Sequence, residues 1–341
     1  MEIWVAIILL AVGFVCLVKG ADWFVDGAAG IAEKLHVPHL VIGLTVVAFG
    51  TSAPELATSI ISSVQGSTGL AIGNIVGSNI TNILLILGLA AIIASLPVYK
   101  DTLKIDFPVL IGASALLLLC GLDGTLSRLE GIVFFVISTV YTVLLIKIAM
   151  GQRDKEKVRT QILEERKEVI IPDDGDKDEP TTAYGRWYKQ MKAHTWFLTV
   201  VTLVGLGIVV LGAQLAVEAA TAIAVKMGIS DRIIGLTVVA IGTSLPELVT
   251  CVVAASKGNT DIAVGDIVGS CIFNILRTLG IAATIAPLVF APEFLIDTAI
   301  ALGAAVLLSA LGWIKDHKIK RWGGIVMLIG FAAYYVYLFA L

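Results

Sequence analysis

The sequence contains two near-identical hexapeptides, GTSAPE at Gly50–Glu55 and GTSLPE at Gly242–Glu247. Both lie within long apolar stretches, and each places a carboxylate next to a proline and two hydroxyl side chains. A carboxylate inside a membrane is costly unless it faces protein, water or a cation, which makes a membrane glutamate a functional candidate. A single glutamate of this kind is compatible with a structural hydrogen-bonding role. The recurrence of Glu55 at Glu247 favours a functional role for both.

The hexapeptides belong to a longer internal repeat. Residues Ile42–Gly88 and Ile234–Gly280 align without a gap at a constant offset of 192, and 28 of the 47 aligned positions are identical. The match continues more weakly upstream, so each repeat unit is about half of the chain. We therefore predict two homologous halves, residues 1–150 and 195–341, joined by a charged linker at 151–194.

Composition indicates that both halves lie in a membrane. Hydrophobic residues make up 57% of the 341-residue chain and charged residues 15%, and the mean hydropathy is +0.94, as is typical of membrane proteins. The predicted membrane-spanning helices are 3–27, 37–64, 70–95, 105–122 and 129–150 in the first half, and 195–223, 230–256, 262–288, 292–314 and 322–341 in the second.

The number of spans determines how the halves are related. Because five is odd, the second half must enter the membrane upside down relative to the first. The predicted fold is an all-α polytopic membrane protein with ten transmembrane helices in two inverted-topology five-helix repeats, an arrangement that recurs in secondary transporters. The first span lacks a convincing cleavage site, so we expect it to be retained.

Charge distribution orients the predicted helices. Twenty charged residues fall between Arg153 and Lys192, and this linker shares a side with most of the basic loop residues, whereas Lys226 and Arg232 go against the trend. By the positive-inside rule we predict an inner (plasma) membrane protein with a cytoplasmic linker and both termini outside. The acidic stretch Asp173–Glu179 lacks EF-hand spacing, which favours a solvated linker over a regulatory calcium site.

The residues around the two glutamates supply further oxygen ligands. Pro54 and Pro246 lack an N–H, so we expect the carbonyls of Gly50 and Gly242 to lose their helical partners. The hydroxyls in the same turns belong to Thr51, Ser52, Thr243 and Ser244. Carboxylate, hydroxyl and carbonyl oxygens without sulfur or imidazole suit hard cations such as calcium or sodium.

The next predicted span of each half carries a polar stripe. The stripes are Asn74, Ser78 and Asn82 in the first half, and Asp266, Ser270 and Asn274 in the second. A spacing of four places each set on one helix face, which should point into the bundle. Glycines beside the stripes favour close helix packing; they are Gly73, Gly77, Gly265 and Gly269.

These motifs give the chain a specific resemblance. The paired G-T-S-x-P-E segments, each followed by G-[ND]-I-V-G-S-x-I-x-N, are similar to the two alpha-repeats of the sodium/calcium exchanger family within the calcium/cation antiporter superfamily, here at about 42–88 and 234–280. The length fits the short prokaryotic members. The resemblance implies ten helices in inverted repeats, with four ion sites between the helices that bear the motifs.

The same resemblance assigns ligands. It implies that Glu55 and Glu247 bind both calcium and sodium, and that Thr51 and Thr243 lend backbone carbonyls to the calcium site. One flanking sodium site would be formed by Ser52, Ser78 and the Ala48 carbonyl, and the other by Ser244, Ser270 and the Ala240 carbonyl. At the middle of the set some relatives carry acids, whereas this chain has Asn82 and Asn274.

We therefore predict a secondary active antiporter, not an enzyme, that exchanges sodium for calcium by alternating access at a midplane site. Two ionised glutamates carry a charge that one calcium ion neutralises and several sodium ions exceed, so exchange should be electrogenic. Sliding of the first and sixth spans is implied by resemblance alone. The expected partners are the two ions and membrane lipid, without a cofactor or nucleic acid; a monomer is one option for the oligomeric state.

Several alternatives remain open at this point. The same glutamates could exchange protons for calcium, although the absence of a third carboxylate from the assigned ligands weakens a proton-coupled or potassium-dependent variant. A passive cation channel is a further alternative. An intramembrane enzyme is less favoured, because the chain lacks H-E-x-x-H and Ala263–Asp266 misses one glycine of G-x-G-D. Arg277, less than one turn beyond Asn274, could pair with an acid, extend to the interface or repel cations.

Overall fold

The structure is a computed structural model that describes residues 2–35, 37–66, 68–167, 191, 194–227, 240–314 and 316–340. In the first half the elements are α1 (Ile3–Leu35), α2 (His39–Ile42), the π-helical η1 (Gly43–Val47), α3 (Ala48–Thr51), α4 (Ala53–Val64), α5 (Thr68–Ile80), the π-helical η2 (Thr81–Ile86), α6 (Leu87–Ile93), the π-helical η3 (Thr102–Asp106), α7 (Phe107–Cys120), the 3-10 turn η4 (Gly121–Asp123) and α8 (Arg128–Lys167).

In the second half the elements are α10 (Thr195–Lys226), α12 (Ala240–Thr243), α13 (Leu245–Ser256), α14 (Thr260–Phe273), the π-helical η6 (Asn274–Leu279), α15 (Gly280–Ile285), α16 (Pro292–Trp313) and α17 (Arg321–Ala340). Residues 228–239, which include the start of the predicted span 230–256, lie outside the described residues. The acidic stretch Asp173–Glu179 and most of the predicted linker also lie outside them.

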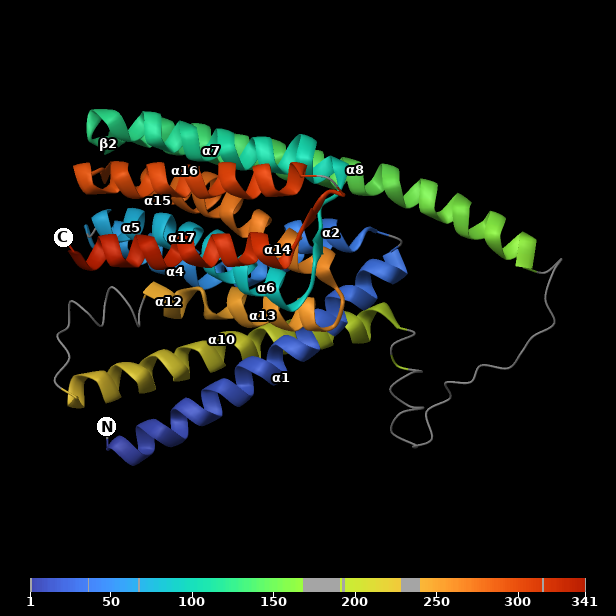
Figure 1. Ribbon diagram of the computed structural model, residues 1–341, viewed down its shortest axis with the longest axis horizontal. Coiled ribbons are helices and arrows are strands. Elements are labelled where there is room, and N and C mark those ends of the chain that lie inside the picture. The colour runs from blue at the N-terminus through green and yellow to red at the C-terminus, as the bar shows by residue number, and fades with distance from the viewer. Residues whose placement is uncertain are drawn as a thin grey trace.

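The helices confirm the predicted all-α polytopic fold. Within the described ranges, eight helical segments are long and apolar enough to cross a membrane, and the bent pair His39–Thr51 and Ala53–Val64 makes a ninth. The remaining predicted span, 230–256, is represented by α12 and α13. The described helices thus agree with ten spans, and both ends of the chain approach the same end of the bundle (Figure 1).

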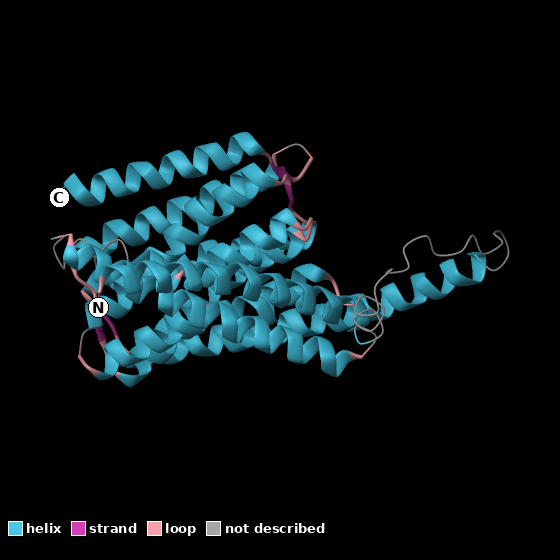
Figure 2. Cartoon of the chain, turned by 90° about the horizontal axis from the view of Figure 1, so that it is seen from below, coloured by secondary structure: helices cyan, strands magenta, loops and turns pink. Residues whose placement is uncertain are grey.

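Two helices run further than their sequence limits suggested. The predicted first span stops at residue 27, but α1 continues to Leu35. The predicted fifth span stops at residue 150, but α8 continues to Lys167 and leaves the bundle at the end opposite the termini (Figure 2). This part of α8 is rich in Lys, Arg, Glu and Gln, which favour helix without needing an apolar environment. The first part of the predicted linker is therefore helical.

The second span has a break at Ser52, two residues before Pro54. Pro54 is in the first turn of α4, Ser52 leaves helical geometry with φ −81° and ψ 7°, and the two helical pieces meet at 45°. Ser244 adopts nearly the same conformation, with φ −89° and ψ 8°, ahead of Pro246. The equal breaks in the two repeats follow from their equal sequences, because proline cannot donate the backbone hydrogen bond that would continue the helix.

The long helices α1 and α10 pack against each other obliquely to the rest of the bundle (Figure 1). Their contact is lined by glycine: a Cβ on Gly13 would lie 2.9 Å from the Gly212 carbonyl oxygen, and one on Gly20 would lie 2.9 Å from the Gly205 carbonyl oxygen. Residue numbers rise along one helix as they fall along the other, so the pair is antiparallel. Because α1 and α10 are equivalent elements of the two repeats, this crossing is one of the places where the inverted halves meet.

Two short strand pairs repeat the same inverted relation. Strand β1 (Leu96–Pro97) pairs with β4 (Lys318–Ile319), and β2 (Thr125–Leu126) pairs with β3 (Leu288–Val289), both antiparallel. The offset of 192 carries β1 onto β3, so each pair joins a loop of one repeat to a loop of the other. The halves therefore interlock at both ends of the bundle.

The centre of the bundle is formed by the spans that carry the polar stripes. The most apolar windows of Thr68–Ile93 and Thr260–Ile285 are 78% and 83% buried, whereas the other long spans are mostly peripheral. The first of these contains α5, η2 and α6, and the second contains α14, η6 and α15. The predicted interior position of both stripes is therefore confirmed.

The predicted glycine packing is present on α14. A Cβ on Gly265 would lie 2.6 Å from the Leu40 carbonyl oxygen, and one on Gly269 would lie 2.7 Å from the Leu44 carbonyl oxygen. Gly73 would meet only the Phe294 ring, and Gly77 would meet no atom within 4 Å in the described part of the chain. The segment that corresponds to Leu40–Leu44 in the second repeat, residues 232–236, lies outside the described residues.

The contact at Gly265 generates a stability prediction. Gly265→Ala places a methyl group against backbone atoms that cannot move aside, so we expect it to destabilise the protein by about 1–3 kcal/mol. The measurement is thermal unfolding of the purified protein in detergent. Gly303→Ala is the matched control, because a Cβ there meets no described atom within 4 Å. Equal melting temperatures for the two variants would contradict the assigned packing.

Candidate functional site

The two glutamates occupy equivalent, wholly buried positions at the centre of the bundle. Glu55 lies in the first turn of α4 and Glu247 in the first turn of α13, and both are 0% exposed. Each follows a helix break, so each carboxylate is close to a helix N-terminus, where exposed N–H groups favour negative charge. The repeated break thus provides two anionic positions inside the apolar bundle.

Each glutamate is contacted by a serine of the other repeat. The Ser52 hydroxyl donates to Glu247 Oε1 at 2.9 Å, and the Ser244 hydroxyl lies 3.3 Å from Glu55 Oε1. These two contacts are related by the offset of 192. The structure therefore brings the two hexapeptides face to face in one site, so neither half could form the site alone.

The threonines make a second pair of contacts between the repeats. The Thr51 hydroxyl lies 2.9 Å from Asp266 Oδ1, and the Thr243 hydroxyl lies 3.3 Å from Asn74 Oδ1. Asp266 and Asn74 are equivalent residues on α14 and α5. The polar stripes therefore contact the threonines of the opposite repeat. The contacting side chain is acidic in the second repeat (Asp266) and neutral in the first (Asn74).

The remaining serines also make contacts between repeats. The Ser244 hydroxyl lies 3.2 Å from the Ser78 hydroxyl, and the Ser270 hydroxyl lies 3.4 Å from the Ala48 carbonyl oxygen. The resemblance groups Ser78 with Ala48 instead, and it groups Ser270 with the Ala240 carbonyl at the start of α12. The described contacts bring all four serines to the glutamate region, and how they divide between ions stays a prediction.

The two asparagines stand at π-helical turns. Asn82 is the second residue of η2, Asn274 begins η6, and both are 0% exposed. The Asn274 amide donates to Asn79 Oδ1 at 3.2 Å, whereas the Asn82 amide has no hydrogen-bond partner among the described residues. π-Helical turns are rare and often occur at functional sites. The position fits the central role that the resemblance gives to these residues.

Several buried oxygens of this region lack a hydrogen-bond donor in the described part of the chain. They are Glu55 Oε2, Glu247 Oε2, Asp266 Oδ2, Asn82 Oδ1 and Asn274 Oδ1. Leaving such atoms unpaired in an apolar interior is costly. Cations would satisfy all of them, and an all-oxygen set suits a hard cation.

The site differs from a preformed metal centre. Over the described ranges, no three His, Cys, Asp or Glu side chains are close enough together to hold one metal ion. A cation between the glutamates would therefore also depend on hydroxyl, amide or carbonyl oxygens. Weaker, mixed coordination is compatible with an ion that must leave the site as well as enter it.

The structure brings one more carboxylate to this region than the expected ligand set contains. Asp266 is 0% exposed and contacts Thr51. Its place on the polar stripe, opposite Asn74 in the repeat, was the signal that could have identified it. The Ser52 N–H donates to the Ala48 carbonyl at 3.1 Å, and Pro54 has no N–H to donate to the Gly50 carbonyl, so that carbonyl lacks its helical partner as predicted.

Arg277 has contacts that narrow its three possible roles. Its guanidinium lies 3.3 Å from the Thr142 hydroxyl and over the rings of Phe49 and Phe273, at 5.7 and 5.2 Å. No acidic residue within the described ranges forms an ion pair with it. The pairing role is therefore not supported, and aromatic faces stabilise the cation instead.

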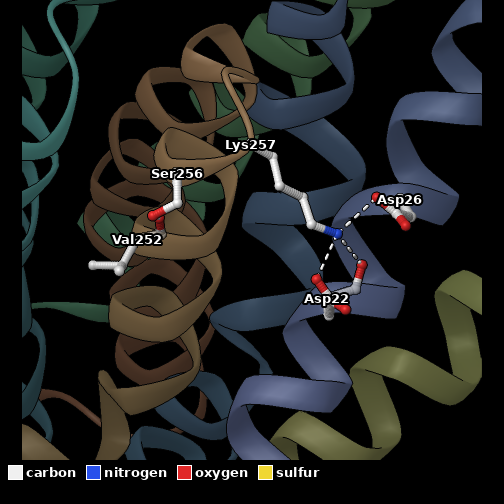
Figure 3. A network of polar contacts seen from close by, with 5 residues as sticks. All are labelled: Asp22, Asp26, Val252, Ser256 and Lys257. Carbon is white, nitrogen blue, oxygen red and sulfur yellow. Dashed lines mark hydrogen bonds and ion pairs between the residues drawn. The ribbon is translucent and has the colours of Figure 1, made fainter.

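An ion-pair network ties α1 to the end of α13 (Figure 3). The Lys257 ammonium lies 2.6 Å from Asp22 Oδ1 and 2.7 Å from Asp26 Oδ1. Partial burial lowers the pKa of Lys257, but the hydrogen bonds to both aspartates outweigh this effect and the pKa lies above its usual value. The position equivalent to Lys257 in the first repeat is Gln65, so the network has no charged copy there.

Comparison with known proteins identifies similar chains of nearly equal length. Residues 5–147 and 197–340 match the family described as "Sodium/calcium exchanger protein". The chain is 38% identical to a putative antiporter, CaxA, of Alkalimonas amylolytica, covering 98% of this chain and 99% of that protein. It is 37% identical to the sodium/calcium exchanger MaX1 of Methanosarcina acetivorans, covering 97% and 98%.

A solved structure has the same fold. The structure of the sodium-calcium exchanger NCX_Mj covers 99% of this chain and 100% of its own, with a TM-score of 0.80 and 31% sequence identity. The similarity therefore spans both repeats and the crossing of α1 and α10.

The unpaired oxygens generate a binding prediction. Ligands that bind only the folded state raise stability, by about 2.7 kcal/mol at a concentration a hundred times the Kd. We expect calcium to raise the melting temperature of the purified protein, and Glu55→Gln to abolish most of that rise. Glu293→Gln, an exposed residue of α16, is the matched control. A rise that persists in Glu55→Gln would remove Glu55 from the site.

Proposed function

The chain belongs to the sodium/calcium exchanger family, and we propose that it exchanges sodium for calcium by alternating access at a site built around Glu55 and Glu247. As a member of this family it is a multi-pass membrane antiporter of calcium and other cations, and not an enzyme. One observation carries the proposal: two buried glutamates from opposite repeats each contact a serine of the other repeat and keep one unpaired oxygen.

Shared ligands explain why the two ions exchange. If calcium and sodium both need Glu55 and Glu247, they cannot occupy the site together. Calcium must then leave before sodium is fully bound, and sodium must leave before calcium is bound. The empty site contains buried carboxylates without counter-ions, which is unfavourable in an apolar bundle. A carrier that changes sides only when loaded couples the two fluxes.

The charge of the site supports electrogenic exchange. One calcium ion brings two positive charges, and the hydroxyl and carbonyl oxygens beside the glutamates offer positions for several sodium ions. If more than two sodium ions replace one calcium ion, each cycle moves net positive charge with sodium. We also propose that the end from which α8 leaves faces the cytoplasm, with both termini outside.

The α1–α10 pair is the best candidate for the moving part. The two helices contact each other through glycines and lie obliquely to the remaining helices. They form a separate layer beside α13, whose first turn bears Glu247. Sliding of this layer past the hexapeptides would open the site to one side and then to the other, while the interlocked strand pairs keep the other loops in place.

Asp266 gives specific support to a second candidate. A third buried carboxylate removes the argument from charge against proton- or potassium-coupled calcium transport. Transport with clamped pH and with sodium, potassium or choline inside the vesicles separates these alternatives from sodium coupling.

The central prediction concerns coupling. Calcium uptake into proteoliposomes should require an outward sodium gradient at constant pH, and Glu247→Gln should lower the uptake rate by at least about tenfold, because one charge-assisted ligand is lost. Glu293→Gln should transport normally. Uptake driven equally well by internal choline would overturn sodium coupling, and normal uptake by Glu247→Gln would overturn the site.

The Lys257 network generates a prediction about the rate. The ion pair joins α1 to α13, so it must break if these helices slide. A partly exposed pair contributes about 0.2–1 kcal/mol, and we therefore expect Lys257→Gln to change the exchange rate at saturating ions by up to about fivefold. Lys320→Gln is the control, because that lysine pairs with Asp316 within its own loop. An equal effect of both variants on the exchange rate would argue against a role of the Lys257 ion pairs in slowing the movement of α1.

A further inference from the structure

Asp266 is a buried carboxylate that the resemblance leaves without a role. It lies in the middle of α14 and is 0% exposed. Its Oδ1 atom accepts a hydrogen bond from the Thr51 hydroxyl at 2.9 Å, and its Oδ2 atom has no partner in the described part of the chain. A carboxylate kept half unpaired at the centre of a membrane protein requires a physical reason.

The equivalent residue of the first repeat shows what a fully bonded side chain looks like at this position. The Asn74 amide nitrogen donates to the Glu55 carbonyl at 3.4 Å and to the Ser59 hydroxyl at 3.2 Å. Its Oδ1 atom accepts from the Thr243 hydroxyl at 3.3 Å. The amide therefore uses both its donor and its acceptor, and the side chain at this position of the first repeat is electrically neutral.

Asp266 cannot copy this arrangement when ionised. The residues equivalent to Glu55 and Ser59 are Glu247 and Cys251. A carboxylate oxygen has no proton to donate to a backbone carbonyl, and the Cys251 thiol lies 3.8 Å from the Ala263 carbonyl, its own hydrogen-bond acceptor. The exchange of amide for carboxylate between the repeats thus replaces a donor by an unpaired anionic oxygen.

Other oxygens gather on the same side of the site. The Thr51 hydroxyl lies 3.4 Å from the Ala48 carbonyl as well as 3.1 Å from the Val47 carbonyl, and the Ser270 hydroxyl lies 3.4 Å from the Ala48 carbonyl. The single proton of Thr51 can serve only one of its three neighbouring acceptors. The group has more acceptor oxygens than protons, which is the environment of a bound cation.

The charge of this group suits a monovalent ion. Its own members are one carboxylate, one carbonyl and two hydroxyls, so the group contributes the charge of Asp266, and the carboxylate of Glu247 is held beside it by Ser52. Over the described ranges no third acid, histidine or cysteine completes a compact metal cluster with it. A divalent ion finds more negative charge between Glu55 and Glu247, whereas a single positive charge is matched by Asp266.

We propose that Asp266 forms a monovalent-cation subsite with the Ala48 carbonyl, Thr51 and Ser270, and that this subsite has no charged copy in the other repeat. This proposal rests on the proposed function and deepens it, because it identifies which part of the site favours sodium. The pair Asp266 and Asn74 makes the inverted halves chemically unequal. Loss of the Asp266 carboxylate removes one sodium ion from the coupled load and leaves the two glutamates to bind calcium.

The test compares Asp266→Asn, which installs the side chain found at Asn74, with the wild type. In sodium-loaded proteoliposomes the variant should need about tenfold more sodium, should show a Hill coefficient for sodium lower by about one, and should keep its apparent calcium affinity within about threefold. Asp261→Asn is the matched control: it removes an acid from the first turn of the same helix, where Asp261 accepts from the Tyr99 hydroxyl at 2.9 Å.

A second measurement separates this proposal from the proposed function. Sodium, with choline at equal ionic strength as reference, should raise the melting temperature of the detergent-solubilised wild type and of Asp261→Asn, and should raise that of Asp266→Asn much less. This result without sodium-driven transport would support the subsite and overturn the exchange function. An unchanged sodium response in Asp266→Asn overturns the subsite, whether its melting temperature without sodium falls or not. Absence of any sodium response in the wild type also overturns it.

Discussion

The structure depends on the cost of holding carboxylates inside an apolar bundle. Glu55, Glu247 and Asp266 are completely buried, and ionised side chains in such surroundings must be compensated by donors or cations. The helix breaks at Ser52 and Ser244 provide part of the compensation, because they place a helix N-terminus and a hydroxyl beside each glutamate. In the proposed function, cations compensate the remaining oxygens. A protein that needs cations to complete its core can carry them only if it also lets them leave.

Inversion of the repeats allows such a site to open on both sides. A single repeat would offer its carboxylate in one orientation, and its serine would have no glutamate to contact. With two inverted copies, Ser52 meets Glu247 and Ser244 meets Glu55. The same symmetry places α1 and α10 at a glycine-lined crossing and joins the loops through two strand pairs. In the proposed mechanism, two equal halves would give access routes of similar shape on the two sides.

The departures from symmetry are as informative as the symmetry. Asp266 stands opposite Asn74, and Lys257 stands opposite Gln65. The first difference changes the charge next to the site, and the second ties α1 to α13 at one end only. A perfectly symmetric carrier would have no preference between its two directions or between its two flanking positions. These two charged substitutions are where this chain can acquire such preferences.

The membrane fold, the two inverted halves and the two glutamates could be predicted from the amino-acid chain alone, because hydropathy, an odd number of spans and a gapless repeat are properties of the chain and not of its packing. Proline positions likewise fixed the helix breaks. The sequence did not determine which residues of opposite repeats would meet, since Thr51 and Asp266 are 215 residues apart. The contact of Asp266 Oδ1 with Thr51, which leaves Oδ2 unpaired, and the aromatic contacts of Arg277 depend on how the helices pack. They cannot be predicted from one span alone, because the surroundings of a buried charge are formed by neighbours that the fold brings to it.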